Sequence, residues 1–300
     1  MADPSAKKTN GTFPPVDVVI VNYNSTDYLL SCIRSIYRVN NGNSLNIYVE
    51  DNGSVDGVER VSREWGDVNL SVKESNEGYS RSVNDGLKKS RAPYVVLLNP
   101  DTVLNPGFFG KVIRCMEEDP AIGVLGPRIL KPDGTIQGSA RSFPTALTAL
   151  FGRNSLLTRW FPDNPISRRN MLHFRSDGKT PMAVDWVSGA CMVVRKEALE
   201  RVGVLDERFF MYWEDVDLCR RMGDGGWKVV YDPEPAVVHH VGGSSGKLLF
   251  RSVYEFHKSC YRLVMKNSRI PEGILAPVLL PLLAARLGAV LLYHAVMNRK

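Results

Sequence analysis

The sequence comprises 300 residues, and its 44% hydrophobic content suffices for the core of one large α/β domain or of two closely packed halves. The 38 basic and 32 acidic residues give a net charge of +6, which favours an anionic partner such as a phosphate or an anionic membrane surface. The basic residues are dispersed and lack accompanying RNA-binding aromatics, so the composition argues against nucleic acid as a partner.

The five cysteines are isolated and form no CxxC pair, which argues against a disulfide framework and against a zinc site. We therefore expect reduced thiols in a cytosolic protein. Residues 1–15 are polar and contain no apolar run of the signal-peptide type, so we expect them to form a disordered lead-in.

From Val16 onward the chain alternates β-branched apolar runs with segments of helical periodicity. Repeated βα units of this kind predict a parallel sheet with right-handed crossovers. Strands are expected at 18–21, 46–49, 68–72, 94–98, 122–125 and 228–231, and helices over about 29–37, 80–90 and 108–118.

The expected strand Tyr94–Leu98 is apolar throughout and is followed by Asn99-Pro100-Asp101. In open α/β sheets ligands bind outside the carboxyl edge, where a carboxylate suits a divalent cation that holds a diphosphate. The same three residues are also ordinary turn formers. A second expected strand ends at Asp51, and the two aspartates together outline a nucleotide-sized crevice.

A glycine-containing turn at Asn76-Glu77-Gly78-Tyr79 precedes the helix expected over 80–90. The N–H groups and the dipole at a helix start favour an anion, and Arg81 adds positive charge there. A plain N-capping turn explains the same pattern, so both interpretations stay open.

Another segment with several candidate functional residues begins with aromatic residues that end at Trp213. It continues with Glu214, Asp215 and Asp217 at the start of an expected helix. Three acids so spaced cannot share one direction, so one can face the site while the others cap the helix or pair with arginines. An ionised acid beside aromatic side chains suits a general base for a hydroxyl nucleophile. An acidic first helical turn without function is the alternative.

Two histidines, His239 and His240, emerge from an apolar strand into a Gly-Gly-Ser turn. A metal ligand and a hydrogen-bonded core residue are both consistent with this position. The stretch 131–177 is rich in Pro, Gly, Ser and Arg, which is typical of binding loops. Its segment 139–144, which contains Arg141, is either surface filler or a substrate contact, and we favour the substrate contact.

Seven motifs follow one another along the chain: Val18–Ser25, Asp51-Asn52-Gly53-Ser54, Asn76-x-Gly78 with Asn84, Asn99-Pro100-Asp101, Trp186-x-Ser188-Gly189-Ala190, Glu214-Asp215-x-Asp217 and His239-His240. In this order they resemble glycosyltransferase family 2 over about Val16 to Lys266, and within it the bacterial rhamnosyltransferases that act on polyprenyl-diphosphate-linked sugars. The resemblance implies a GT-A fold with a Rossmann-like, mostly parallel sheet, a nucleotide-sugar donor, Mg²⁺ or Mn²⁺, and inversion at the anomeric carbon.

Carried onto this sequence, the resemblance makes Asp215 the catalytic base with Glu214 beside it. Asp101 ends the family's DxD-like metal motif, and His239 or His240 stands where the family can place a metal or diphosphate ligand. Asn99 replaces the first acid of that motif, which leaves one charged ligand. The donor-binding residues would be Asn22, Tyr23, Asn24, Asp51, Asn52, Gly53, Asn76, Gly78, Arg81, Asn84, Asn99 and Asp101, and the acceptor-binding residues Arg141, Trp186, Ser188, Gly189 and Trp213.

The C-terminal part predicts an amphipathic helix over 252–266 and a strongly apolar segment over 274–297. Pro277, Pro281 and Arg286 argue against a membrane span and favour an interfacial hairpin or helix. Docking on the catalytic core is the alternative. With a lipid-linked acceptor, we expect peripheral attachment at the cytoplasmic face of the membrane.

The sequence therefore predicts a nucleotide-sugar-binding half over 16–130, an acceptor and base half over 131–250, and C-terminal helices over 251–300. The expected function is transfer of L-rhamnose from dTDP-rhamnose in cell-envelope polysaccharide synthesis. A UDP-sugar donor (galactofuranose, glucose or N-acetylglucosamine) and a non-catalytic sugar-nucleotide-binding protein stay open. A nucleotidyltransferase is disfavoured because its basic, glycine-rich loop is missing.

Overall fold

The computed structural model describes residues 13–40, 42, 44–144, 170–240, 249–268 and 270–297. Most of the expected lead-in over 1–15 lies outside the described residues. So do 145–169 of the expected binding loops and the Gly-Gly-Ser turn after His240.

The first part of the chain forms the predicted parallel βα units, and β1 lies between β2 and β4 with both pairings parallel. Strand β3 extends the sheet beyond β2, again in parallel. The carboxyl ends of β1, β2 and β4 therefore meet at one edge, as predicted. These elements are β1 (Val16–Asn22), α1 (Thr26–Val39), β2 (Leu45–Asp51), α2 (Arg60–Glu64), β3 (Asn69–Val72), α3 (Tyr79–Lys89) and β4 (Tyr94–Leu98).

The second part adds strands in both directions, so that the sheet has the order β3-β2-β1-β4-β10-β6-β11-β5, with β8 beside β11. Strand β10 runs antiparallel to both β4 and β6, whereas β11 is parallel to β6. The elements are β5 (Thr102–Leu104), α4 (Phe108–Glu118), β6 (Ile122–Leu130), β7 (Ala140–Arg141), η1 (Leu172–Arg175), β8 (Met182–Ala183), β9 (Trp186–Val187), β10 (Cys191–Arg195), α8 (Lys196–Val202), α9 (Glu214–Asp224) and β11 (Lys228–His239).

Two strands are longer than the sequence pattern indicated. Strand β6 continues to Leu130, and β11 continues from Tyr231 through Asp232-Pro-Glu-Pro to His239. The register with β6 shifts between Asp232 and Ala236, so the two prolines lie in an irregularity of the ladder. Proline is accepted at such positions because the ladder needs no N–H there.

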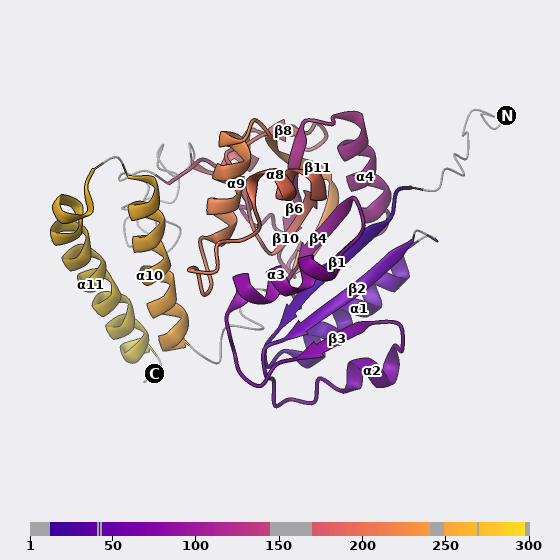
Figure 1. Cartoon of the computed structure of the whole chain (residues 1–300), viewed down its shortest axis with the longest axis horizontal. Coiled ribbons are helices and arrows are strands. Elements are labelled where there is room, and N and C mark those ends of the chain that lie inside the picture. The colour runs from indigo at the N-terminus through magenta and orange to yellow at the C-terminus, as the bar shows by residue number, and fades with distance from the viewer. Residues whose placement is uncertain are drawn as a thin grey trace.

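The sheet is covered on both faces by helices, and alternate residues of each strand enter two separate cores (Figure 1). Val18 and Ile20 of β1 pack in the core that includes α1 and α4. Val19 and Val21 pack in the core of α3, α8 and α9. Leu218 and Met222 of α9 are buried, as predicted.

The chain ends in two helices, α10 (Leu249–Asn267) and α11 (Glu272–Met297), which pack against each other at one end of the molecule beside α9 (Figure 1). Helix α11 continues through Pro277 and Pro281. Leu263 of α10 is buried with Phe209 and Val216, which attaches this helix to the α/β domain.

Candidate active site

The turns after β1 and β2 are joined by hydrogen bonds around Asp51. Its Oδ1 accepts from Asn22 Nδ2 at 2.8 Å and from Ser54 Oγ at 2.6 Å, and its Oδ2 accepts from the Ser54 N–H at 2.8 Å. Ser54 Oγ also accepts from the Asn24 N–H at 2.8 Å. Asp51 is fully buried, and its hydrogen bonds hold the two turns together; direct contact of Asp51 with a donor stays a prediction.

Gly53 and Gly78 both require glycine. Gly53 has φ +73°, and a Cβ there would lie 3.1 Å from the Lys73 carbonyl oxygen. Gly78 has φ +99°, and a Cβ there would lie 2.7 Å from the Phe210 carbonyl oxygen. The Tyr79 N–H donates to that same oxygen at 2.6 Å. The glycine turn thus connects the donor half to the loop that precedes α9.

Asn76 shapes this turn, because its Oδ1 accepts from the Gly78 N–H at 3.0 Å. Asn52 faces the start of α3, where Ser82 Oγ donates to its Oδ1 at 2.7 Å. Arg81 is exposed and lies 3.6 Å from Glu77, at the position predicted for an anion ligand.

The Asn84 side chain points towards the loop after α8. Its side-chain amide is buried, donates to the Leu205 carbonyl at 2.9 Å and accepts from the Leu205 N–H at 3.1 Å. Its Nδ2 also donates to Glu207 Oε1 at 3.0 Å. Asn84 therefore positions the loop after α8, and these contacts give no support to donor binding by Asn84.

Asp101 and His239 meet at the carboxyl edge, with 3.2 Å between Asp101 Oδ1 and His239 Nε2. His239 Nδ1 lies 3.0 Å from Gln137 Oε1, which only accepts, so Nδ1 carries the proton. In a neutral ring the Nε2 lone pair then faces a carboxylate oxygen. A cation between these two groups satisfies both, so the residues fit a divalent metal.

The other predicted metal ligand, His240, differs from His239. The His240 ring lies beside Tyr28 with 5.7 Å between ring centroids, and its backbone N–H donates to the Asp101 carbonyl at 2.9 Å. Within the described parts of the chain, no three His, Cys, Asp or Glu side chains are grouped to hold a metal. Bound here, a metal would need ligands from a diphosphate or water to complete its coordination.

The base region begins with two aromatics in left-handed conformation, Tyr212 (φ 67°) and Trp213 (φ 70°). Helix α9 starts directly after them with Glu214 and Asp215. Asp215 Oδ2 accepts from the Gly189 N–H at 3.0 Å, and its Oδ1 accepts from the Val216 N–H at 2.8 Å. Asp217 instead pairs with Arg221 at 2.9 Å and with Lys266 at 2.7 Å, so the acids point in different directions, as predicted.

The two adjacent carboxyl groups have different electrostatic surroundings. Burial, reinforced by the charge of Asp215, raises the pKa of Glu214 to about 8. Burial also raises the pKa of Asp215, but the N–H groups of Gly189 and Val216 and the charge of Arg141 oppose that rise. Of the two carboxyl groups, Asp215 thus has the N–H donors and the nearby cation that stabilise a carboxylate, whereas burial favours the protonated form of Glu214.

The expected acceptor residues surround Asp215. Strand β7 pairs with β9, which sets Arg141 opposite Trp186, and the Arg141 guanidinium lies 5.4 Å from the Trp186 ring centroid. Trp186 Nε1 donates to the Ser142 carbonyl at 2.9 Å, and the Ser188 N–H donates to Ser139 O at 2.9 Å. The structure thus brings Arg141, Trp186, Ser188 and Gly189 together beside Asp215.

The sequence analysis did not predict three residues that lie at the candidate site. Gln137 orients His239, Ser54 holds Asp51, and Tyr79 lies against Gly189, with 3.4 Å between Tyr79 Oη and the Gly189 carbonyl oxygen. Ser54 and Tyr79 stand inside motifs that the sequence displayed. Nothing in the local pattern around Gln137 connects it with a histidine 102 residues later.

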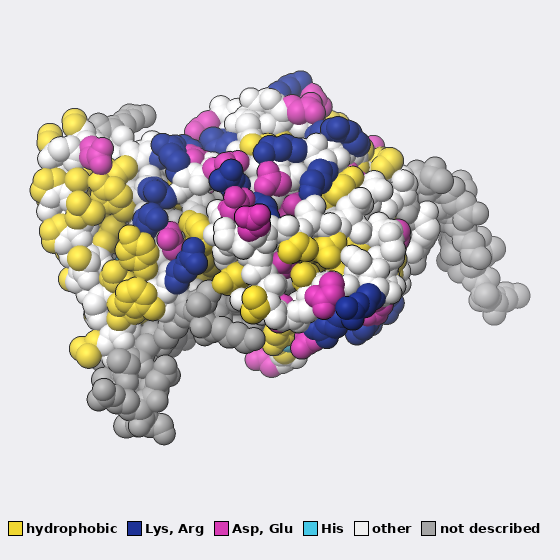
Figure 2. Space-filling model, turned by 60° about the horizontal axis from the view of Figure 1, so that its bottom comes forward, with side chains coloured by type: hydrophobic (Ala, Val, Ile, Leu, Met, Phe, Trp, Pro, Cys, Tyr) yellow, Lys and Arg dark blue, Asp and Glu magenta, His cyan; other side chains and the backbone are white. Residues whose placement is uncertain are grey.

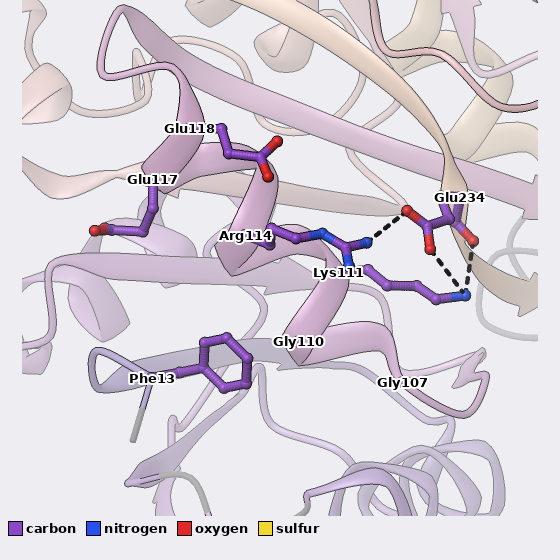
Figure 3. A pocket seen from close by; sticks show the side chains of 8 residues that line it. All are labelled: Phe13, Gly107, Gly110, Lys111, Arg114, Glu117, Glu118 and Glu234. Atoms are coloured by element: carbon purple, nitrogen blue, oxygen red, sulfur yellow. Dashed lines mark hydrogen bonds and ion pairs between the residues drawn. The ribbon is translucent and has the colours of Figure 1, made fainter. Parts of the chain in front are cut away.

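A surface hollow of about 580 Å³ lies outside this site, between Phe13, α4 and Glu234 (Figure 3). Arg114 crosses it to pair with Glu234 at 2.7 Å. The hollow contains none of the predicted site residues, so volume does not identify the active site here.

The mostly parallel sheet, with Asp51 and Asp101 near the carboxyl ends of β2 and β4, belongs to the GT-A fold. Two solved structures share this fold. GalNAc-T7 with UDP, GalNAc and Mn²⁺ matches with a TM-score of 0.59 and 17% identity, over 78% of this chain and 45% of that one. The mannosyltransferase PcManGT from Pyrobaculum calidifontis, in complex with GDP-Man and Mn²⁺, matches with a TM-score of 0.58 and 17% identity, over 96% and 81%.

The chain belongs to the family described as glycosyltransferase like family 2, whose model matches residues 14–255. It is similar to the N-acetylglucosaminyl-diphospho-decaprenol L-rhamnosyltransferase of Mycobacterium tuberculosis, with 32% identity over 256 residues, 81% of this chain and 82% of the relative. The predicted family, fold and enzyme class are thereby confirmed.

Proposed function

We propose that this glycosyltransferase transfers L-rhamnose from dTDP-rhamnose, with inversion, to a hydroxyl of a polyprenyl-diphosphate-linked sugar during cell-envelope polysaccharide synthesis. The observation that carries the chemistry is the Asp215 carboxylate, which is held by the Gly189 N–H beside Arg141 and Trp186. The choice of substrates is supported by the activity of the Mycobacterium tuberculosis relative, which is similar to this chain over most of both sequences.

In this reaction Asp215 accepts the proton of the acceptor hydroxyl while the hydroxyl oxygen forms a bond to the anomeric carbon. The bond from that carbon to the diphosphate oxygen breaks on the opposite face, and the nucleoside diphosphate leaves with the electron pair. Holding both substrates in line supplies a large part of the rate gain.

The leaving diphosphate is placed at the carboxyl edge, near Asp101 and the glycine turn at Gly78. Asp101 and His239 would hold Mn²⁺ or Mg²⁺, and the bound ion supplies positive charge for the leaving group. One carboxylate and one imidazole favour Mn²⁺ over Mg²⁺, because imidazole is a poor ligand for Mg²⁺.

The test combines a binding assay with a transfer assay. The melting temperature of the protein is measured against dTDP- and UDP-sugars with and without Mn²⁺ or Mg²⁺, because a ligand of the native state raises it. Transfer from dTDP-rhamnose to a synthetic prenyl-diphosphate N-acetylglucosamine is then followed for the wild type and for Asp215→Asn. We expect a shift selective for dTDP-rhamnose in both proteins and loss of transfer by roughly 10³-fold in the variant.

The matched control is Asp224→Asn, at an exposed aspartate near the end of the same helix, which should transfer at the wild-type rate. Near-normal transfer by Asp215→Asn would contradict the assignment of the base. A larger thermal shift with UDP-galactofuranose, UDP-glucose or UDP-N-acetylglucosamine would show that the donor is that UDP-sugar. The assignment of Asp215 as the base would not be affected.

The second element of the proposal is attachment of α11 to the cytoplasmic face of a membrane. Glu272–Leu292 is long and apolar enough to cross a membrane by length and composition, with none of that window buried. Ile274, Val278 and Leu282 follow one another at four-residue intervals with 60–65% exposure. Figure 2 shows hydrophobic side chains gathered over the end of the molecule that α10 and α11 form, with Lys and Arg on the adjoining surface.

Arg286, which the sequence analysis weighed against a membrane span, points towards α10. Its Nη1 lies 2.9 Å from His257 Nε2, and its guanidinium lies 5.4 Å from the Phe256 ring centroid. Because α10 carries Glu255 and Lys258 and packs along α11, a transverse position would bring charged groups into the bilayer. These contacts support a helix that lies in the interface with its apolar face outward.

Flotation of the full chain with vesicles of anionic phospholipid tests this attachment. We expect co-flotation of the wild type and its loss in Ile274→Glu/Val278→Glu, since two charges on the outward face oppose insertion. The control Ser31→Glu/Ser62→Glu adds the same charge at exposed positions of α1 and α2. Equal flotation of all three proteins would contradict the proposed contact.

A further inference from the structure

The loop before the catalytic helix has a backbone conformation that its own residues disfavour. We call residues 209–213 the base loop. Its last two residues, Tyr212 and Trp213, are bulky aromatics with φ values of 67° and 70°. Left-handed conformations cost about 1–2 kcal/mol per residue for such side chains, so they persist only where the surroundings hold them.

The contacts that hold this loop come from α10, more than 40 residues later. Ser259 Oγ donates to the Met211 carbonyl at 2.9 Å, and Trp213 Nε1 donates to the Phe256 carbonyl at 3.2 Å. The Phe256 ring lies against both strained residues, with centroid distances of 5.8 Å to Tyr212 and 5.2 Å to Trp213. Ser259 is fully buried, so its hydrogen bond is shielded from water.

Further contacts keep α10 in this position. Leu263 is buried against Phe209 and Val216, on the two sides of the strained residues. Lys266 pairs with Asp217, which is 1% exposed, at 2.7 Å. Helix α10 therefore contacts both the base loop and the first turn of α9.

The base loop sets the direction in which α9 begins. Trp213 is the N-cap of α9, and its carbonyl accepts the Asp217 N–H at 3.0 Å. Asp215 lies in this first turn, where its carboxylate must meet the Gly189 N–H of a different segment. Rotation at Tyr212 or Trp213 would move Asp215 away from Gly189, and a shift of about 1 Å in a catalytic group can cost a hundredfold in rate.

We propose that α10 holds the base loop in its strained conformation, with Phe256 and Ser259 acting as positioning residues for Asp215. The inference rests on the proposed function, because it requires Asp215 to be the base. It gives the C-terminal helices a role in the rate of transfer in addition to any contact with a membrane.

The experiment compares Phe256→Leu, Ser259→Ala and their combination in the full-length protein, with dTDP-rhamnose and the prenyl-diphosphate acceptor. We expect kcat to fall by about 10-fold in each single variant and by about 100-fold in the combination. The KM for the donor and the thermal shift caused by dTDP-rhamnose should stay at wild-type values, because Phe256 and Ser259 contact residues 211–213 and not the turns after β1 and β2. Phe256→Tyr, which keeps the ring, should restore kcat, and Tyr254→Leu removes an exposed aromatic of the same helix as the control.

A kcat within twofold of wild type in the combined variant, while Asp215→Asn is inactive, would overturn this inference and leave the proposed function intact. A rise of donor KM at unchanged kcat would also overturn it. Transfer by Asp215→Asn at the wild-type rate would contradict both this inference and the proposed role of Asp215, because Asp215 would then not be the base that α10 positions. If the combined variant does not fold, as judged by circular dichroism, the kcat of Ser259→Ala alone tests the inference. A wild-type kcat in that variant would then overturn it.

Discussion

The turns after β1 and β2, which we propose to bind the donor and call the donor edge, lie near the base loop but are stabilised in a different way. At the donor edge, Asn22, Asp51 and Ser54 are buried or partly buried polar groups that hydrogen-bond to one another across two neighbouring βα turns. The base loop has strained aromatics whose partners come from α10. Contacts between the strand-end turns hold the donor edge, whereas the position of Asp215 depends on a distant helix. Donor binding and proton transfer should therefore be separable by mutation.

Among the variants that test this difference between the donor edge and the base loop, those of Asp101 and His239 should have the largest effect. We expect Mn²⁺ to bind appreciably only when dTDP is present, because the described residues supply two ligands and the diphosphate supplies others. Asp101→Asn or His239→Ala should weaken this binding at least about 10-fold and lower transfer by roughly 10²–10³-fold. Electron paramagnetic resonance of free Mn²⁺, with and without dTDP, measures the binding.

His240→Ala is the matched control for that experiment. Its ring lies beside Tyr28, and only its backbone N–H bonds to Asp101, so Mn²⁺ binding should stay at the wild-type level. Tight Mn²⁺ binding without nucleotide, or an equal loss in both histidine variants, would contradict the assignment of His239.

Gly78 connects the two regions, and its replacement should disturb both. Gly78→Ala combines a positive φ with a Cβ placed 2.7 Å from the Phe210 carbonyl oxygen, so we expect a loss of about 3 kcal/mol. This corresponds to a fall of about 6–12 °C in Tm, together with weaker dTDP-rhamnose binding and slower transfer. Differential scanning calorimetry provides the measurement.

Gly134→Ala separates backbone strain from the clash, because Gly134 has φ +81° but nothing within 4 Å of its Cβ position. It should lower Tm by about 2–4 °C, the effect of roughly 1 kcal/mol of strain alone. Equal losses in the two variants would show that the contact with Phe210 contributes nothing.

The smallest expected effect is a pH dependence of stability from Glu214. The pKa of Glu214 is raised from 4.5 to about 8 in the folded protein, so between these values the folded state keeps a proton that the unfolded state has lost. The contribution of Glu214 to stability is therefore present below about pH 4.5 and is lost as pH rises to about 8. Between pH 5 and pH 9, the Tm of Glu214→Gln should rise relative to the Tm of the wild type by about 3 °C or more, as melting curves would show.

Glu200→Gln, at an exposed position of α8, is the control for the loss of one carboxylate. A difference between wild type and Glu214→Gln that stays constant with pH would show that Glu214 is ionised throughout this range. The two acids would then share the same charge state, and the division of roles between Glu214 and Asp215 would need revision.

The sequence predicted the carboxyl edge of β1, β2 and β4 because its geometry is local. Strands rich in β-branched residues alternate with helices, so Asp51 at the end of β2 and Asp101, three residues after β4, must lie at one sheet edge. Asp101 and His239 could be paired only through the family resemblance, yet the structure places them 3.2 Å apart. Predictions that fall on single side chains, such as donor binding by Asn84, failed to find support because side-chain direction depends on the loop packed against the helix.

By itself, the sequence determined the family, the α/β alternation, the carboxyl edge with Asp51 and Asp101, and the acidic start of α9. The tertiary structure alone decided that Arg141 and Trp186 lie beside Asp215, that Gln137 orients His239, and that Arg286 turns towards α10. Contacts between residues 29 to 102 positions apart leave no periodic signal in a sequence, because each partner follows only its own local pattern. The hold of α10 on the base loop is of this kind, and only the folded chain reveals it.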